Sequence, residues 1–142
     1  MLIGSLGLEM EIRDGQGFNL LLTLSGDTIR EGAGYQILAT IDGVYIHDGQ
    51  NRIVRNVADN HIREGAGAKI LYTVRGDGIF EASGSKILFV MKGADLFDPS
   101  GFKPVLTATE RLTPVQIAAV LYALEHIGFT VDPINRPPEQ RP

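Results

Sequence analysis

The sequence contains no cysteine and no tryptophan, and its excess of negative charge is small. The lack of cysteine excludes disulfide scaffolds and thiolate metal sites. With 21% charged residues, 44% hydrophobic residues and a net charge of −4, the composition fits neither a disordered chain nor a general binder of polyanions. A chain of 142 residues has room for one domain with a single core. We therefore expect one folded unit with no nucleic acid partner.

Long hydrophobic runs are also missing. The longest apolar stretch, residues 115–124, is about half of the roughly 20 residues that span a bilayer. The apolar start of the chain has no basic flank and is interrupted early by Glu9 and Glu11, which is not typical of a signal peptide. These observations predict a cytoplasmic protein.

Glycine, in contrast, is abundant, and its 17 positions follow a repeat. The segment IREGAGYQIL that starts at Ile29 returns at Ile62 as IREGAGAKIL and, more diverged, at Ile79 as IFEASGSKIL. A shift of seventeen residues, once of sixteen, defines six copies within residues 11–110. Each copy starts at an apolar anchor, and the six anchors are Ile12, Ile29, Ile46, Ile62, Ile79 and Leu96.

Each copy has the pattern of a β-hairpin. An acid lies two residues after the anchor, and a turn residue that tolerates positive φ lies five residues after it. These turn positions hold Gly17, Gly34, Asn51, Gly67, Gly84 and Gly101. A β-rich run and a second turn follow, so turns recur every eight or nine residues, which is typical of all-β sandwiches and barrels.

Six hairpins give about twelve strands, too many for an open twisted sheet that leaves its edges exposed. We predict a mainly β fold in which the hairpins form a closed or radial barrel-like arrangement. Strict alternation assigns Ile37, Ala39 and Ile41, and their equivalents such as Ile70 and Ile87, to the core. It assigns to the opposite face a Leu or Val in every copy: Leu21, Leu38, Val54, Leu71, Leu88 and Val105.

A helix is predicted over residues 114–127. Thr113, Pro114 and Gln116 form a capping-box start, and Gly128 is placed to end the helix. The helix is apolar nearly all round, which indicates burial. It either fills the barrel or packs on a second copy in a homo-oligomer. We expect one domain over residues 1–131 and a loose proline-rich tail over residues 132–142.

Six hairpins followed by a hydrophobic helix resemble the tubby C-terminal and LURP-one-related architecture, a twelve-stranded barrel around a central helix. The short acid and Gly-x-Gly repeat also resembles the hairpin-repeat domains called β-flowers. The tubby resemblance implies binding to phosphoinositides or a membrane surface through basic residues. We do not assign the lipid site of tubby-like domains to this chain, because its basic residues lie close to repeat acids. These basic residues are Arg13, Arg30, Arg63, Lys69, Lys86 and Lys103.

The repeat acids are Asp14, Glu31, Asp48, Glu64, Glu81 and Asp98. In a radial arrangement they could form a ring that binds Ca²⁺, but we favour hydrogen bonds from each carboxylate to its own turn, which aspartate commonly forms. The residues that follow four anchors are expected to pair across strands with acids of neighbouring hairpins: Arg13, Arg30, His47 and Arg63. We predict no catalytic residue, metal site or cofactor.

One copy departs from the repeat. Arg55 occupies a strand position that is apolar elsewhere, so it lies either at an opening or beside a buried acid. We hypothesise that the third copy, one residue shorter, breaks the ring where a ligand or partner binds, with these residues at the site: Asn51, Arg52, Arg55 and Asn56.

The sequence therefore favours a non-catalytic binding or scaffold module for a protein or small-molecule ligand that remains to be identified. Two alternatives stay open: membrane-surface phospholipid binding of the tubby-like type, and a small hydrolase that uses carboxylates at the rim.

Overall fold

The structure is a computed structural model and describes residues 9–84 and 86–129. Twelve strands precede a single helix. The strands are β1 (Glu9–Asp14), β2 (Leu20–Ser25), β3 (Thr28–Glu31), β4 (Ile37–Asp42), β5 (Tyr45–Asp48), β6 (Ile53–Ala58), β7 (His61–Glu64), β8 (Ile70–Arg75), β9 (Gly78–Glu81), β10 (Lys86–Lys92), β11 (Asp95–Phe97) and β12 (Pro104–Ala108), and the helix is α2 (Pro114–His126).

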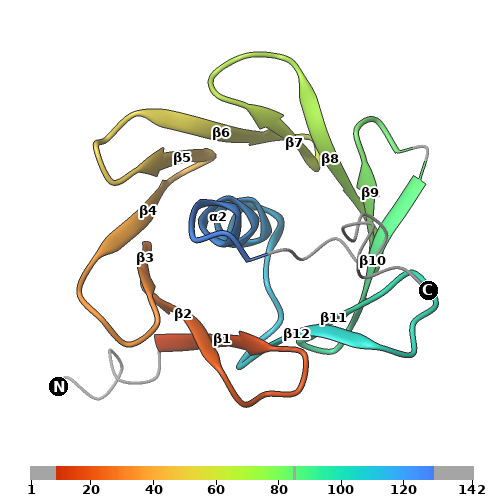
Figure 1. Cartoon of the computed structure of the whole chain (residues 1–142). Coiled ribbons are helices and arrows are strands. Elements are labelled where there is room, and N and C mark those ends of the chain that lie inside the picture. The colour runs from red at the N-terminus through yellow and green to blue at the C-terminus, as the bar shows by residue number, and fades with distance from the viewer. Residues whose placement is uncertain (1–8, 85, 130–142) are drawn as a thin grey trace, which may run out of the picture.

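The strands form a closed antiparallel barrel around the helix (Figure 1). Each strand pairs with its neighbours in the chain, and β1 closes the ring on β12 with Ile12 opposite Ala108. The predicted barrel of six hairpins is confirmed. Because the strands alternate in direction, the loops within the copies (β1–β2, β3–β4 and so on to β11–β12) lie at one end of the barrel, the tip rim. The loops between copies lie at the other end, the turn rim.

A β-bulge interrupts every hairpin at the same place, and it corrects the predicted core. In the second copy Ile29 pairs with Ala39 but Arg30 pairs with Ile37, so Leu38 is an extra residue. The other five copies show the same shift. Leu38 is consequently buried, whereas Ile37 is 44% exposed. Strict alternation was therefore right for Ala39 and Ile41, which are buried, and wrong for Ile37, while its equivalents Ile70 and Ile87 are only partly buried.

The bulge residues complete the core instead. Leu38 and Leu88 are buried in it, and three more bulge residues pack against it: Leu21, Val54 and Val105. The anchors are the best buried positions of the barrel, with exposures of 0–2% in all six copies. The repeat thus supplies an anchor and a bulge residue to one continuous core.

The turn prediction holds in part. Gly17, Asn51, Gly84 and Gly101 have positive φ as expected. In the second and fourth copies the left-handed residues are Gly32 and Gly65, two positions earlier in the loop than predicted. In all six copies the backbone N–H five residues after the anchor donates to the carbonyl of the repeat acid, so the turn itself is common to them all.

The helix begins and ends as predicted, within one residue. The Thr113 hydroxyl accepts from the Gln116 backbone N–H, and the Gln116 side chain accepts from the Thr113 N–H. At the other end Gly128 has φ 80, and the N–H groups of Gly128 and Phe129 donate to carbonyls of the last turn in a Schellman arrangement.

The helix lies inside the barrel. Its residues from Ile117 to Leu121, with Ala123 and Leu124, are buried. It packs mainly on the strands from β2 to β7, so it lies toward that side of the ring (Figure 1). The sequence left two positions open for the helix, inside the barrel or against a second copy, and the structure places it inside the barrel. In the described part of the chain no helix has the length and apolar character needed to cross a membrane. The predicted tail, residues 132–142, lies outside the described residues.

Candidate functional site

A buried charge lies inside the barrel on the third copy. Arg55 of β6 is the register partner of the anchor Ile46, so it takes an inward position that other copies fill with residues such as Leu22 and Phe89. Only 7% of Arg55 is exposed. Its Nη2 donates to Glu125 Oε1 on the last turn of α2 at 2.8 Å. Arg55 was predicted to lie either at an opening or beside a buried acid; it is paired with an acid, but that acid is exposed at the mouth of the barrel and not buried.

The Glu125 carboxylate accepts hydrogen bonds from side chains of two strands, β6 and β8. Its second oxygen, Oε2, accepts from the Tyr72 hydroxyl at 3.1 Å, and the Glu125 side chain is 45% exposed at the mouth of the barrel. The Arg55 guanidinium lies 5.5 Å from the centre of the Tyr122 ring. Its Nη1 is buried and has no hydrogen-bond partner. A buried N–H group without an acceptor is costly, so Arg55 has donor capacity that the described residues leave unused.

A cavity opens beside this cluster at the tip rim. It has a volume of about 370 Å³ and lies between the β5–β6 loop, the start of β4 and the last turn of α2. Donors are plentiful in its wall, since two glutamines, an arginine, a tyrosine and a histidine contribute to it. The lining residues are Gln36, Ile37, Leu38, Asp48, Gly49, Gln50, Arg52, Tyr122 and His126.

Asp48 is the acid that lines the cavity, and groups of its own turn donate hydrogen bonds to both of its carboxylate oxygens. Its Oδ1 accepts from the backbone N–H groups of Gln50 and Arg52 at 2.8 and 2.9 Å, and Oδ2 accepts from Arg52 Nε at 2.9 Å. The hydrogen bond from the Arg52 backbone is the main cause that lowers the pKa of Asp48. Asp48 therefore holds the Arg52 guanidinium at the wall of the cavity, where 71% of the Arg52 side chain is exposed.

Tyr122 separates the cavity from Arg55. Burial, followed by the negative charge of Asp48, raises the pKa of Tyr122 above its ordinary value, so the hydroxyl keeps its proton at neutral pH. The Tyr122 ring lies 6.2 Å from the His126 ring. The cavity thus presents a neutral phenol and the Arg52 guanidinium, with the Arg55 guanidinium behind the Tyr122 ring, which suits a ligand that accepts hydrogen bonds.

The structure brings together two of the four predicted site residues. Arg52 lines the same cavity as Tyr122, and Arg55 lies 5.5 Å from the centre of the Tyr122 ring. Asn51 is the turn residue of the β5–β6 loop, with φ 66. Asn56 does not join them, because it follows the inward-facing Arg55 in β6 and so lies on the opposite face of the strand, where its Nδ2 donates to the carbonyls of Gly65 and Gly67 in the next copy.

The third copy does not break the ring, contrary to the prediction. Both of its strands pair on both sides, β5 with β4 and β6 with β7. The polar residues of this copy instead meet the end of the helix. Sequence reasoning missed Tyr122 and Glu125 as partners, although Glu125 interrupts an apolar helix and offered a signal.

Among the other repeat acids, the aspartates and the glutamates differ in whether the side chain bonds to its own turn. The Asp14 and Asp98 side chains accept from N–H groups of their own turns, as Asp48 does. The exposed side chains of Glu31, Glu64 and Glu81 show no such bond in the described region. The turn role is thus confirmed for the aspartates alone. Across the described positions no group of three or more His, Asp or Glu side chains could hold a metal ion.

The predicted pairing of basic residues with neighbouring hairpins was wrong for Arg13. Arg13 Nη2 binds Glu11 of its own strand at 2.8 Å, and both side chains are partly exposed. For Arg30, His47 and Arg63 the described residues show no ion pair. Exposed pairs of this kind contribute little to stability.

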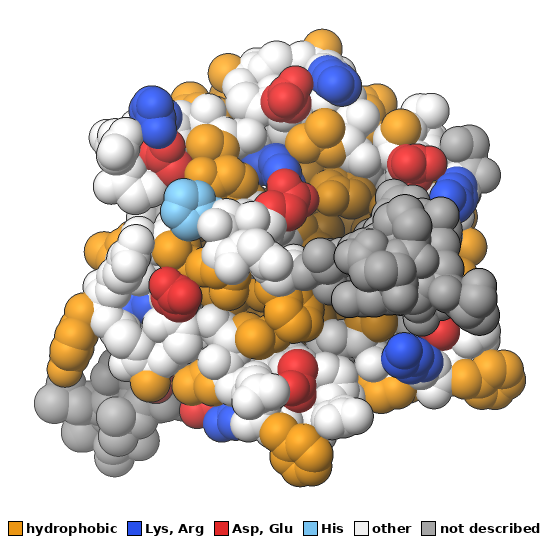
Figure 2. Space-filling view, in the orientation of Figure 1, with side chains coloured by type: hydrophobic (Ala, Val, Ile, Leu, Met, Phe, Trp, Pro, Cys, Tyr) orange, Lys and Arg blue, Asp and Glu red, His pale blue; other side chains and the backbone are white. Residues whose placement is uncertain are grey.

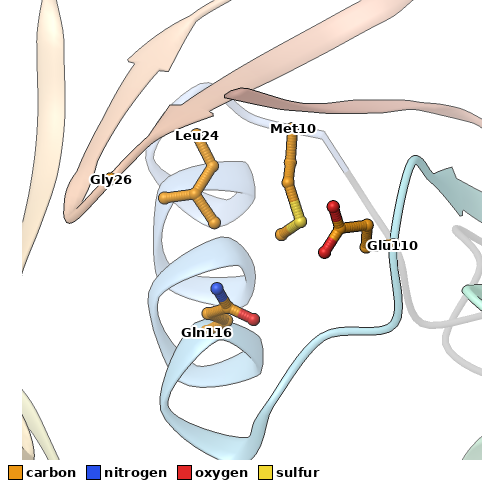
Figure 3. A pocket seen from close by; sticks show the side chains of 5 residues that line it. All are labelled: Met10, Leu24, Gly26, Glu110 and Gln116. Atoms are coloured by element: carbon orange, nitrogen blue, oxygen red, sulfur yellow. The ribbon is translucent and has the colours of Figure 1, made fainter. Parts of the chain in front are cut away.

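A smaller cavity lies at the turn rim (Figure 3). It has a volume of about 170 Å³ and lies between the N-terminal part of α2 and the β1–β2 hairpin. Met10 and Leu24 form one side, and Glu110 and Gln116 face them. Gln116 is already used by the helix cap, so this cavity offers few polar groups to a ligand.

The closed ring of six bulged hairpins around one helix defines the class of protein: a hairpin-repeat barrel. The family model described as "6-fold beta flower protein" matches residues 12–121. The chain belongs to this family, as the β-flower resemblance predicted. No curated protein and no solved structure matches the chain.

Proposed function

We propose that the protein is a non-catalytic binding module that takes a small ligand at the mouth of the barrel, in the cavity beside Tyr122. The observation that carries the proposal is Arg55. It is a buried charge within an otherwise apolar ring of equivalent positions, and its Nη1 has no acceptor. A ligand in the cavity would meet Arg52 and Tyr122 directly, with the Arg55 guanidinium behind the Tyr122 ring, so Arg55 would act on the ligand through its charge and through the position of Tyr122.

The chemistry of the acids supports binding over catalysis. A general acid or base works best with a pKa near the operating pH. The hydrogen bonds within their turns instead lower the pKa of Asp48 and of Asp98, with the Ser100 hydroxyl as the main cause for Asp98. These aspartates serve their turns, and this observation does not favour the hydrolase alternative.

A thermal-shift screen of small metabolites tests the proposal. A ligand at about a hundred times its dissociation constant should stabilise the protein by roughly 2.7 kcal/mol. The variant Arg55→Leu, which restores the residue type of the other copies, should lose the shifts seen with the wild type. The matched control is Arg111→Leu, which removes an arginine paired with Asp77; it should keep every shift.

Two results would count against the proposal. Shifts that persist unchanged in Arg55→Leu would show that the ligand binds without this arginine. A screen with no shift for any compound would exclude a small-molecule site of this kind and favour a protein partner.

A further inference from the structure

A recurring backbone hydrogen bond ties neighbouring copies together at the tip rim. In three copies the N–H group after the repeat acid donates to the carbonyl of the bulge residue in the copy before it. These bonds, of 2.8–2.9 Å, run from Gly32 to Leu21, from Gly65 to Val54 and from Ala82 to Leu71. In all three copies the repeat acid is glutamate, and the donor residue has left-handed backbone with φ of 50–56. The bond thus joins the tip loop of one copy to the strand of its neighbour.

The third copy lacks this bond because its repeat acid is aspartate. The Asp48 carboxylate accepts from the N–H groups of Gln50 and Arg52, and this gives the loop a different conformation. The left-handed residue of the turn is Asn51, with φ 66, and Gly49 is not left-handed. Within the part of the chain that the structure describes, the Gly49 N–H has no hydrogen-bond partner.

The position of Gly49 against β4 is also different. A Cβ on Gly49 would lie 2.9 Å from the Ile37 carbonyl oxygen, whereas a Cβ on Gly32 would lie 3.8 Å from the equivalent oxygen of Leu20. Gly49 therefore approaches β4 closely, but in an orientation that does not direct its N–H to the bulge carbonyl. The Leu38 carbonyl is left without the donor that the equivalent carbonyls have. We call this junction of Gly49 with Leu38 the seam.

The other aspartate copies replace the missing bond with one from a side chain. The Thr107 hydroxyl donates to the Asp14 carbonyl at 3.3 Å, and Lys92 Nζ donates to the Gly101 carbonyl at 2.6 Å. Thr40 is the equivalent of Thr107 at the third copy, and among the described residues it forms no such bond. Over residues 9–84 and 86–129, the seam is thus the one junction between copies that has neither kind of bond.

The seam lies in the wall of the mouth cavity. Leu38 and Gly49 both line the cavity, and the last turn of α2 contributes Tyr122 and His126 to the same space. The cavity therefore has a backbone donor on one copy and a backbone acceptor on the neighbouring copy. In ligand sites, groups of this kind fix the orientation of the bound molecule.

The charges at this site are already balanced. Arg52 Nε binds Asp48 Oδ2 at 2.9 Å, and Arg55 binds Glu125 at 2.8 Å. Burial raises the pKa of Tyr122, which is neutral at pH 7. On the face of the molecule in Figure 2, acidic and basic side chains lie close to one another, and neither sign forms an extended patch. A charged ligand would add a charge without a counterpart, so the site favours an uncharged one.

Building on the proposed function, on which this inference rests, we propose that the mouth cavity takes an uncharged ligand with an amide group. The amide oxygen accepts from the Gly49 N–H, and the amide N–H donates to the Leu38 carbonyl. One amide thereby supplies both partners that the seam lacks. The class includes carboxamides, lactams and nitrogen heterocycles with an amide edge. A cavity of about 370 Å³ is at the small end of ligand sites, which suits a single substituted ring.

Titration with benzamide tests the proposal, with the backbone amide resonances of the isotope-labelled protein as the readout. Benzamide should shift the Gly49 resonance with a saturable dependence on concentration. Benzoate has the same shape and a negative charge, and it should bind about tenfold or more weakly. A change from about 0.05 M to about 0.5 M NaCl should alter the dissociation constant of benzamide by less than about twofold, because salt does not screen an uncharged ligand.

A double variant is designed to close the seam. Asp48→Glu with Asn51→Gly gives the loop EGQG, which has the pattern of the EGAG loops in the second and fourth copies. This loop should form the bond from the Gly49 N–H to the Leu38 carbonyl, slow hydrogen exchange at Gly49 and abolish benzamide binding. The matched control is Asp14→Glu, which makes EGQG from the DGQG loop of the first copy, away from the cavity. It should bind benzamide as the wild type does.

Hydrogen exchange of the free wild type tests the seam itself, since Gly49 should exchange faster than Gly32 and Gly65. The proposal is overturned if Gly49 is as protected as those two glycines, or if benzamide causes no shift at the mouth. It is also overturned if benzoate binds as well as benzamide, or if the double variant keeps wild-type affinity. The comparison of the two compounds uses the wild type alone, so a double variant that does not fold leaves the test intact.

Failure of this inference is distinguishable from failure of the proposed function. Metabolite shifts that Arg55→Leu removes, together with no binding of benzamide, would keep the mouth as a ligand site and reject the amide class. Benzamide binding at Gly49 that persists unchanged in Arg55→Leu would support the amide class and count against the role of Arg55.

Discussion

At the scale of single residues, the acid two positions after the anchor forms different contacts depending on whether it is aspartate or glutamate. Aspartate at this position is short enough for its carboxylate to reach N–H groups of its own turn, as Asp14, Asp48 and Asp98 all do. Glutamate in the other copies leaves its side chain exposed, and within the described residues only its backbone groups hydrogen-bond in the loop. The acid pattern visible in the sequence therefore reflects the hairpin, and only Asp48 adds a functional contact by holding Arg52.

The lowered pKa of Asp48 gives a pH-dependent prediction. Its hydrogen bonds, first that from the Arg52 backbone, hold the pKa below the ordinary value of 3.8. The ionised carboxylate thus stabilises the fold above about pH 4, and this contribution is lost as the pH falls through the lowered pKa. Asp48→Asn should be less stable than the wild type at neutral pH, and urea unfolding should show the difference shrinking in acid.

The matched control for this experiment is Glu31→Gln at the equivalent position of the second copy. Its exposed carboxylate makes no hydrogen bond within the described residues, so the substitution should change the free energy of unfolding little. A deficit of Asp48→Asn that is equally large at every pH would contradict the assigned role of the ionised carboxylate.

At the scale of elements, the β-bulge is what the sequence did not reveal. Hairpin boundaries and turns were predictable because Gly, Asn and the acids recur at fixed spacing. The bulge adds one residue to the longer strand without any change in composition, because Ile37 and Leu38 are both apolar. An alternating pattern cannot distinguish which of two adjacent apolar residues faces inward when the register shifts between them.

A pair of substitutions tests this bulge. Leu38→Ala should cost about 2–5 kcal/mol in the free energy of unfolding, as expected for a buried leucine. Ile37→Ala should cost well under half as much, because 44% of that residue is already exposed. Chemical denaturation measures both. Strict alternation predicts the reverse order, and that order would refute the observed register.

The helix, in contrast, was predictable almost residue by residue. Its start depends on a local capping box and its end on Gly128, and neither requires tertiary contacts. Its burial followed from its composition. Its partners could not be predicted, since Glu125 meets Arg55 and Tyr72 only after the ring has closed around the helix.

At the scale of the whole molecule, the protein is a ring of similar hairpins in which Arg55 is the copy-specific charge at an inward position. The five inward positions equivalent to Arg55 in the other copies hold uncharged residues. The helix packs on the side of the barrel that includes β6 and Arg55. The cavity, the buried arginine and the end of the helix meet at the same mouth. The proposed function depends on the claim that Arg55 is retained for binding and that the fold does not need its charge.

The free energy of unfolding of Arg55→Leu, measured by chemical denaturation, tests this claim most directly. Arg55→Leu is expected to be as stable as the wild type within about 1 kcal/mol, or more stable, because leucine removes the desolvation cost of a buried charge. Glu125, with 45% of its side chain exposed, stays solvated without its partner. A loss of about 3–5 kcal/mol, typical of breaking a buried ion pair, would show that Arg55 serves the fold and would contradict the account.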